Sequence, residues 1–160
     1  MNNMQIEDYI RSEMTSPKKD AALDFVAFLR SHNLHFHRDT GSYWKDKIYY
    51  WVQLGNECVC FISIKNPEDA HKQWTVWSDN MGSEWLEQSD VDDQTKESAW
   101  KHVDHCGHCG SCSGGKPKVI FGKQFNCVCG CTFVVDDPGF DDLGFLKKMV
   151  EIRILEIRDR

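Results

Sequence analysis

One stretch decides the fold class that this 160-residue sequence predicts: Ile48-Tyr-Tyr-Trp-Val-Gln-Leu-Gly-Asn-Glu-Cys-Val-Cys-Phe-Ile-Ser-Ile64. Its two halves, 48–54 and 57–64, are rich in β-branched and aromatic residues, which favour strands. They flank Gly55-Asn56, a two-residue signal for a tight hairpin. The sequence therefore predicts an antiparallel hairpin at the centre of the fold.

This hairpin has an expected register. With the turn in that place, Leu54 lies opposite Glu57, and Val52 lies opposite Val59. Apolar residues then occupy both faces of the hairpin, so we expect the sheet to be covered on both sides.

Other segments predict further strands and the first helices. Strands are expected at 35–37, 43–45 and 74–77, and a second hairpin at 119–125 and 132–135. Amphipathic helices are expected over 4–14 and from Pro17 to His32, with Ser16 as the N-cap of the second helix.

The second half of the chain predicts two more helices. Residues 79–94 are acidic and poorly periodic, which indicates an exposed connection. Asp92 or Asp93 is expected to cap a short helix that runs to Val103. The last helix begins at Asp141 and Asp142, whose negative charge suits a helix N-terminus. Its apolar stripe consists of Leu143, Leu146, Met149 and Val150.

Together these elements predict an α+β fold. An antiparallel sheet of about four to six strands is flanked by N- and C-terminal helices. The length fits one domain over 1–160. Within it, residues 104–133 form a zinc-ribbon-like, cysteine-rich insertion.

The composition narrows the classes of function. The net charge is −6 and no basic stripe is visible, which disfavours nucleic acid as a partner. No apolar run approaches the ~18 residues of a membrane-spanning helix, so no membrane partner is expected. The first residues lack the basic start and apolar run of a secretory signal. The expected location is cytoplasmic, where thiols stay reduced.

Six of the eight cysteines lie between residues 106 and 131. In a reducing compartment, such a cluster indicates metal or redox chemistry rather than disulfides. Cys106 and Cys109 form a Cys-x2-Cys pair followed by glycine, a turn from which two thiolates can bind one ion. A second cysteine-containing turn, expected between Cys127 and Cys131, would complete a tetrahedral zinc site. This spacing resembles a zinc ribbon.

The expected zinc ligands are Cys106, Cys109, Cys112 and Cys129. Cys129 is included because glycine follows it directly, as glycine follows Cys109. Four residues nearby in the sequence are reserves that could replace one of these ligands: Cys127, Cys131, His105 and His108.

The expected zinc is structural. So many nearby thiols leave no evident open position for water, and no glutamate stands in a His-x-Glu or His-Glu-x-x-His context. We therefore expect a non-enzymatic, zinc-binding protein whose partner is a small molecule or another protein.

The same cysteines support two alternatives. The run Cys106-x2-Cys109-x2-Cys112, followed by Lys116-Pro117, resembles the cluster-binding run of bacterial ferredoxins, with lysine in place of the fourth cysteine. An iron–sulfur cluster is therefore one alternative. The other is thiol-redox chemistry through neighbouring thiols.

Two further groups of residues lie in or near the predicted sheet. Cys58 and Cys60 are expected to pack in the core, because free cysteine behaves as a small apolar residue. An aromatic-lined pocket for a cationic or aromatic ligand is the second hypothesis. Its residues would be Trp51, Trp74, Trp77, Glu84 and Trp85, and aromatic core packing is the alternative for the tryptophans.

The C-terminal third of the chain resembles the tail of an uncharacterised bacterial protein family. The resemblance rests on Cys106-Gly-His-Cys-Gly110, Ile120-Phe-Gly-Lys-Gln-Phe125 and Cys129-Gly130. It implies no activity, because none is assigned to that family. The front half is similar in architecture to small bacterial domains that bind drugs or other small molecules, an analogy of fold only.

Overall fold

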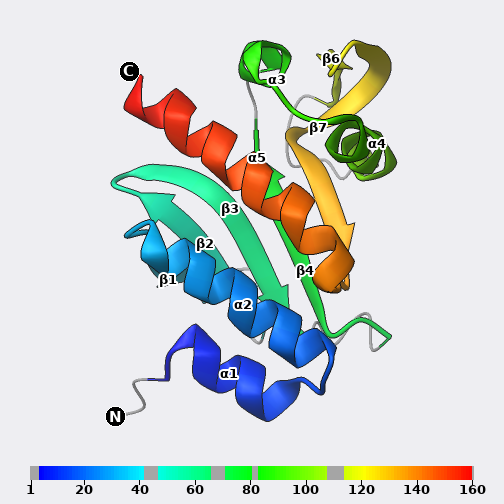
Figure 1. Ribbon diagram of the computed structural model, residues 1–160. Coiled ribbons are helices and arrows are strands. Elements are labelled where there is room, and N and C mark those ends of the chain that lie inside the picture. Colours follow the sequence, from blue (N-terminus) through cyan, green and yellow to red (C-terminus); the bar gives the residue numbers. More distant parts are fainter. Residues whose placement is uncertain (1–3, 42–46, 66–70, 81–82, 108–113, 160) are drawn as a thin grey trace.

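The computed structural model describes residues 4–41, 47–65, 71–80, 83–107 and 114–159 (Figure 1). Within these residues the chain forms five helices and seven strands. In chain order they are α1 (Ile6–Glu13), α2 (Lys18–Ser31), β1 (His35–Arg38), β2 (Ile48–Leu54), β3 (Glu57–Ile64), β4 (Trp74–Asp79), α3 (Ser83–Gln88), α4 (Asp93–Lys101), β5 (Val103–His105), β6 (Lys116–Ile120), β7 (Lys123–Asp136) and α5 (Phe140–Arg158).

The strands form one antiparallel sheet in the spatial order β1-β2-β3-β4-β7-β5, with β6 also paired to β7. Helices α2 and α5 lie side by side across one face of this sheet, and α1 packs against α2 (Figure 1). Helices α3 and α4 lie at the end of the molecule that carries β6. The expected α+β class, with N- and C-terminal helices flanking an antiparallel sheet, is confirmed.

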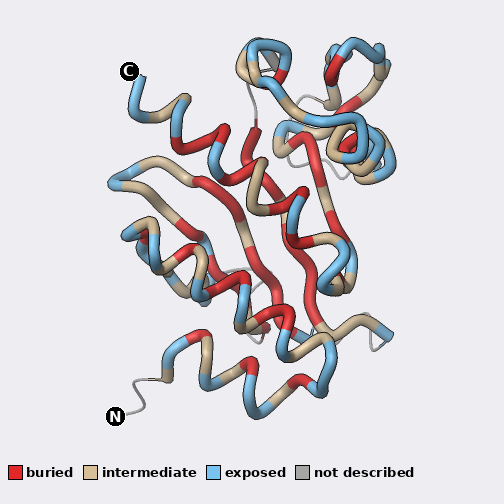
Figure 2. Tube along the Cα trace, in the orientation of Figure 1, coloured by how far each residue is buried: buried red, intermediate tan, exposed pale blue. Residues whose placement is uncertain are grey.

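The main core lies between the sheet and the helices α2 and α5. Figure 2 shows buried residues along the central strands and the inner sides of these helices. Phe25, Ile62 and Trp74 are essentially inaccessible to solvent. The Trp74 ring lies 6.1 Å from the Phe25 ring, and its Nε1 donates to the carbonyl oxygen of Pro138 at 2.9 Å. Burial of each such side chain contributes about 1.5–3 kcal/mol.

The central hairpin forms at the expected turn, but its register changes beyond the first pairs. Leu54 lies opposite Glu57 as expected, whereas Val52 lies opposite Cys60 instead of Val59. A β-bulge accounts for this correction, because two residues of β3 there face one residue of β2. Both Val59 and Cys60 are fully buried as a result.

Among the described residues, no helix covers the opposite face of the central strands. There the rings of Tyr49, Trp51, Phe61 and Trp77 form a row, with neighbouring centroids 6.0–6.2 Å apart. Trp51 remains 36% exposed. We expected both faces to be covered, and within the described residues helices cover one of them.

Most of the predicted helices are present, with differences at their ends. Helix α2 has Pro17 rather than Ser16 as its N-cap. Asp92 caps α4 as expected, accepting a hydrogen bond from the amide of Thr95 at 2.8 Å. Helix α4 ends at Lys101, because Val103 already belongs to β5.

Two further predictions concern the connection at 79–94 and the strand at 43–45. The segment expected as an exposed connection contains α3, whose Leu86 is fully buried. The strand expected at 43–45 lies outside the described residues. Within the described residues, no helix is long and apolar enough to cross a membrane.

The largest difference concerns the second predicted hairpin. The first expected strand, 119–125, contains the end of β6, a turn and the start of β7. The long strand β7 then continues through the expected cysteine turn and the second expected strand. The observed hairpin joins β6 to β7 through Phe121 and Gly122, whose φ angles are 46° and 83°. Phenylalanine rarely adopts a positive φ, so this turn has a weak sequence signal. The expected turn between Cys127 and Cys131 is therefore wrong, since both residues lie within a strand.

Candidate metal centre

The pairing of β5 with β7 brings Cys106 and Cys127 together. His105 lies opposite Val128, and the following amide, that of Cys106, donates to the carbonyl oxygen of Cys127 at 3.0 Å. Residues opposed in this way project their side chains from the same face of the sheet. The two side chains therefore lie side by side, and both thiols could bind one ion.

Gly115 closes one side of this thiol pair. Its amide donates to Sγ of Cys106 at 3.2 Å. A Cβ placed on Gly115 would lie 2.6 Å from Cβ of Cys106 and 2.8 Å from Sγ of Cys127, which is too close for any side chain. Glycine is therefore required here.

The surroundings of Cys127 disfavour the charged form of its thiol. Burial raises the pKa of Cys127, and the hydrogen bond and charge of Cys106 raise it further. Two adjacent thiolates repel each other, and a bound cation removes that repulsion. The pair therefore has the electrostatics of an incomplete metal site.

A second group of thiols lies farther along β7. Cys129 and Cys131 lie within β7, and Asp104 lies on the neighbouring strand β5. Burial raises the pKa of Cys131 to about 12, and the nearby charges of Cys129 and Asp79 act in the same direction. Burial also raises the pKa of Asp104, while the hydrogen bond with Cys129 lowers it.

The structure describes only part of the expected ligand set. It brings Cys106 next to Cys127, while Cys129 and Cys131 lie farther along β7. His105 is exposed at the end of β5. Three expected or reserve ligands lie outside the described residues: His108, Cys109 and Cys112. Within the described part of the chain, no three histidine, cysteine or acidic side chains come close enough to hold a metal ion.

The residues of the hypothetical aromatic pocket lie in three places. Trp51 and Trp77 belong to the row of aromatic rings on the opposite face of the sheet. Trp74 is buried on the helix-covered face. Glu84 and Trp85 lie on α3, at the end of the molecule near β6 (Figure 1). Sequence alternation could have separated Trp74 from Trp77, because residues three apart on a strand face opposite sides.

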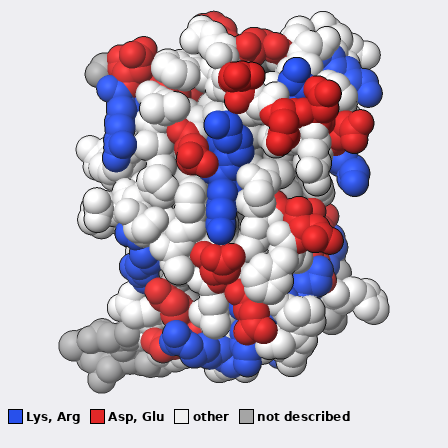
Figure 3. All heavy atoms as spheres, viewed as in Figure 1, with Lys and Arg blue, Asp and Glu red and all other residues white. Residues whose placement is uncertain are grey.

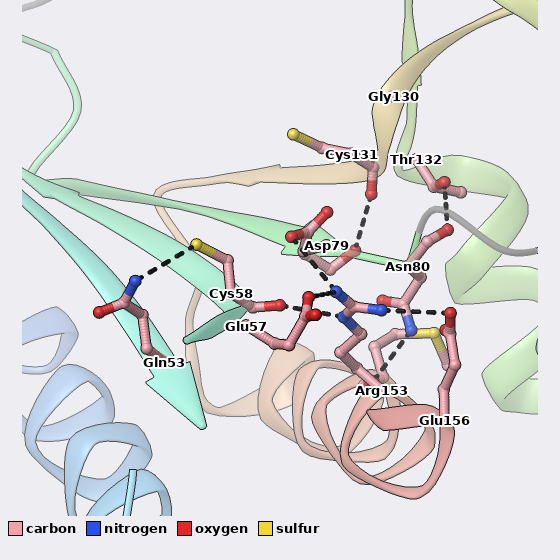
Figure 4. Close-up of polar contacts among 12 residues, drawn as sticks. Gln53, Glu57, Cys58, Asp79, Asn80, Gly130, Cys131, Thr132, Arg153 and Glu156 are labelled. Atoms are coloured by element: carbon pink, nitrogen blue, oxygen red, sulfur yellow. Dashed lines mark hydrogen bonds and ion pairs between the residues drawn. The ribbon is translucent and has the colours of Figure 1, made fainter. Parts of the chain in front are cut away.

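Sequence reasoning missed a buried charged cluster where α5 crosses the sheet (Figure 4). Arg153 is 3% exposed, and its Nε donates to the carbonyl oxygen of Cys58 at 3.0 Å. Its guanidinium nitrogens lie 3.2–3.8 Å from the carboxylates of Glu57, Asp79 and Glu156. Burial raises the pKa of Asp79, and the charge of Arg153 opposes that shift. The available signal was the position of this arginine between two isoleucines of an amphipathic helix.

A surface groove of about 460 Å³ lies between α4 and α5. Figure 3 shows acidic side chains gathered over α4 on this side of the molecule. The charged residues that line the groove are Asp90, Asp92, Asp141, Lys148 and Glu151. The lining is therefore mainly acidic, unlike the aromatic pocket that the sequence suggested.

No protein-family profile, curated protein sequence or solved structure matches this chain.

Proposed function

We propose that residues 104–133 hold one structural zinc ion and that the chain is a non-enzymatic binding protein of the reducing cytoplasm. The observation that carries this proposal is the opposed thiol pair of Cys106 and Cys127, beside which only glycine fits at position 115. Closed zinc sites use four thiolate or imidazole ligands. The described residues supply half of such a set.

Cys109 and Cys112 are the proposed remaining ligands. Both lie outside the described residues, but chain length limits their distance from the pair. Each is three residues from Cys106 or Gly115, a span of about 10 Å at full extension. Relative to the expected set, Cys127 replaces Cys129, because Cys127 directly opposes Cys106.

The proposed zinc acts as a cross-link. It would join the end of β5 to β7 on the face where the thiols project, and its closed sulfur coordination leaves no position for a reacting water. A structural site of this type contributes on the order of 10 kcal/mol of coupled binding and folding energy. The order of this end of the molecule would then depend on the metal.

Elemental analysis of untagged protein, purified without added metal, tests the proposal. The expected result is about one zinc per chain. The variants C106S and C127S should lose the zinc and melt at a lower temperature. The matched control is C58S, which removes a half-buried thiol of β3 outside the cysteine-rich element and should keep the zinc.

Other results would contradict either the assignment of Cys127 or the zinc proposal as a whole. One zinc per chain in C127S would contradict the assignment of Cys127. Iron with visible absorbance would replace the proposal with the iron–sulfur alternative. A metal-free protein whose thiols oxidise reversibly would favour the thiol-redox alternative.

The row of aromatic rings supports a second candidate, a ligand surface on the sheet. Tyr49 stacks on Phe61, while Trp77 and Trp51 contact these two rings edge to face, and Trp51 is 36% exposed. Such a surface suits a flat aromatic or cationic small molecule. Quenching of tryptophan fluorescence by a bound compound, lost in W51A but kept in W85A, would support it. Equal quenching in both variants would contradict it.

A further inference from the structure

Strand pairing places Cys106 and Cys127 directly opposite each other. His105 pairs with Val128, so the next residue of the first strand faces the preceding residue of β7. The Cys106 amide donates to the carbonyl oxygen of Cys127 at 3.0 Å. Opposed residues with this bond have Cα atoms about 5.5 Å apart. That separation is typical of a disulfide, whose Cα atoms lie about 4.4–6.8 Å apart.

The side chains of this pair border one small space beside Gly115. A Cβ placed on Gly115 would lie 2.6 Å from Cβ of Cys106 and 2.8 Å from Sγ of Cys127. The Gly115 amide also donates to Sγ of Cys106 at 3.2 Å, so that sulfur borders the same space. Because glycine has no side chain to intervene, rotation about the Cα–Cβ bonds of the cysteines can bring the two sulfurs together.

The strand register favours this pair over the other described cysteines. Cys129 lies two residues farther along β7 than Cys127, and Cys58 lies opposite Gln53 on β2. Cys106 and Cys127 are both partly exposed, so a small oxidant can reach them from solvent.

We propose that Cys106 and Cys127 are a site of reversible oxidation, at which a peroxide converts the two zinc-binding thiolates into a disulfide between the end of β5 and β7. In a reducing compartment, disulfides of this kind are transient and serve redox sensing. The disulfide rests on the strand pairing alone. Its consequence, the release of zinc, rests on the proposed structural site.

The step balances with hydrogen peroxide as the oxidant. One thiolate sulfur attacks a peroxide oxygen, the O–O bond breaks, hydroxide leaves, and the sulfur becomes a sulfenic acid. The second thiolate attacks this sulfur, the S–S bond forms, and a second hydroxide leaves. In total, two thiolates, one H2O2 and two protons give one disulfide and two water molecules, and two electrons pass from sulfur to oxygen. Because the thiolate is the form that binds metals, the zinc ion loses two ligands.

The test is anaerobic addition of one equivalent of hydrogen peroxide to the reduced, full-length protein, with the chromogenic chelator 4-(2-pyridylazo)resorcinol present to report free zinc. The expected product has lost two hydrogen atoms, and fragmentation mass spectrometry of its peptides locates one disulfide between Cys106 and Cys127. One zinc ion per disulfide should be released. Dithiothreitol with added zinc should restore the starting protein.

C129S is the matched control, because it removes a thiol of the same strand that does not oppose Cys106. It should still form the disulfide and release zinc, whereas C127S should form no disulfide from Cys106. The peptide map of the wild-type protein needs no variant, so a misfolded C127S leaves the test intact. A disulfide from Cys106 to any other cysteine, or sulfinic acid at either position without a disulfide, would overturn the proposal.

Two results separate this site from the proposed zinc. Protein that is purified without zinc but still forms the Cys106–Cys127 disulfide would reject the structural zinc and keep the oxidation site, as would zinc that stays bound after this disulfide forms. Zinc-loaded protein whose two thiols do not react with peroxide would keep the zinc and overturn the oxidation site.

Discussion

The helix-covered part of the sheet and its cysteine-bearing end, defined as Val103–Cys106 with 114–131, are ordered by different forces. In the first, Val52, Ile62 and Val76 are at most 1% exposed and pack beneath α2 and α5. In the second, the buried apolar residues are Val103, Ile120, Phe121 and Val128. This end also carries the clustered thiols, and a metal bound to them would add a cross-link to that apolar packing.

Of the substitutions considered, removal of the buried charge of Arg153 in the helix-covered part should lower the free energy of unfolding most. Arg153→Met leaves three carboxylates near one another without their shared buried cation. We expect the free energy of unfolding to fall by about 3–5 kcal/mol, measured by urea denaturation. The control is Lys147→Met on the same helix, whose pair with Asp24 is more exposed and worth less than about 1 kcal/mol. Equal effects of the two substitutions would contradict this account.

The next largest loss of stability should come from substitution of Gly115 in the cysteine-bearing end. In Gly115→Ala the new methyl group would lie 2.6 Å from Cβ of Cys106 and 2.8 Å from Sγ of Cys127. We expect a loss of about 1–3 kcal/mol from this overpacking, together with reduced zinc content. Thermal unfolding and elemental analysis measure the two effects. If Gly115→Ala kept the stability and zinc content of the wild type, Gly115 would not pack against Cys106 and Cys127 as the structure has it.

The same substitution on α5 should act in the opposite direction. Gly144 is an exposed residue inside that helix, and a Cβ added there meets no atom within 4 Å. Gly144→Ala should therefore raise the free energy of unfolding by about 0.5–1 kcal/mol, since alanine is the better helix former. Urea denaturation checks this value. If Gly144→Ala were less stable than the wild type, the space around Gly144 in the groove between α4 and α5 would not be open.

The smallest effect concerns an ion pair at the edge of the helix-covered part. Arg30 donates to both carboxylate oxygens of Glu7, at 2.9 and 3.0 Å, and these bonds lower the Glu7 pKa below its usual 4.5. A carboxyl group with a lowered pKa stabilises the fold above its unfolded pKa and loses that contribution as the pH falls through its folded pKa. Glu7→Gln should therefore cost at most about 1 kcal/mol at neutral pH. The difference should vanish in acid, and a difference that persists there would contradict the ionic origin.

Local sequence signals predicted much of the fold but less of the site. The hairpin turn, the cap at Asp92 and the stripe of α5 follow from short-range rules, and the structure contains them. The bulge at Val59 and the course of β7 depend on what the neighbouring strands require, so periodicity alone misplaced them. For the same reason, spacing identified Cys106 as a ligand candidate but ranked Cys129 above Cys127.

By itself, the sequence determined that this chain folds into an antiparallel sheet with terminal helices, because alternating apolar residues and helix caps act over a few neighbouring positions. It also determined that thiols are concentrated in one segment. Only the tertiary structure decided which thiols meet, because strand pairing joins β5 to β7 across a long stretch of chain. It likewise decided that Arg153 is buried among carboxylates, since strands β3 and β4 and helix α5 all have to be in place before those charges face one another.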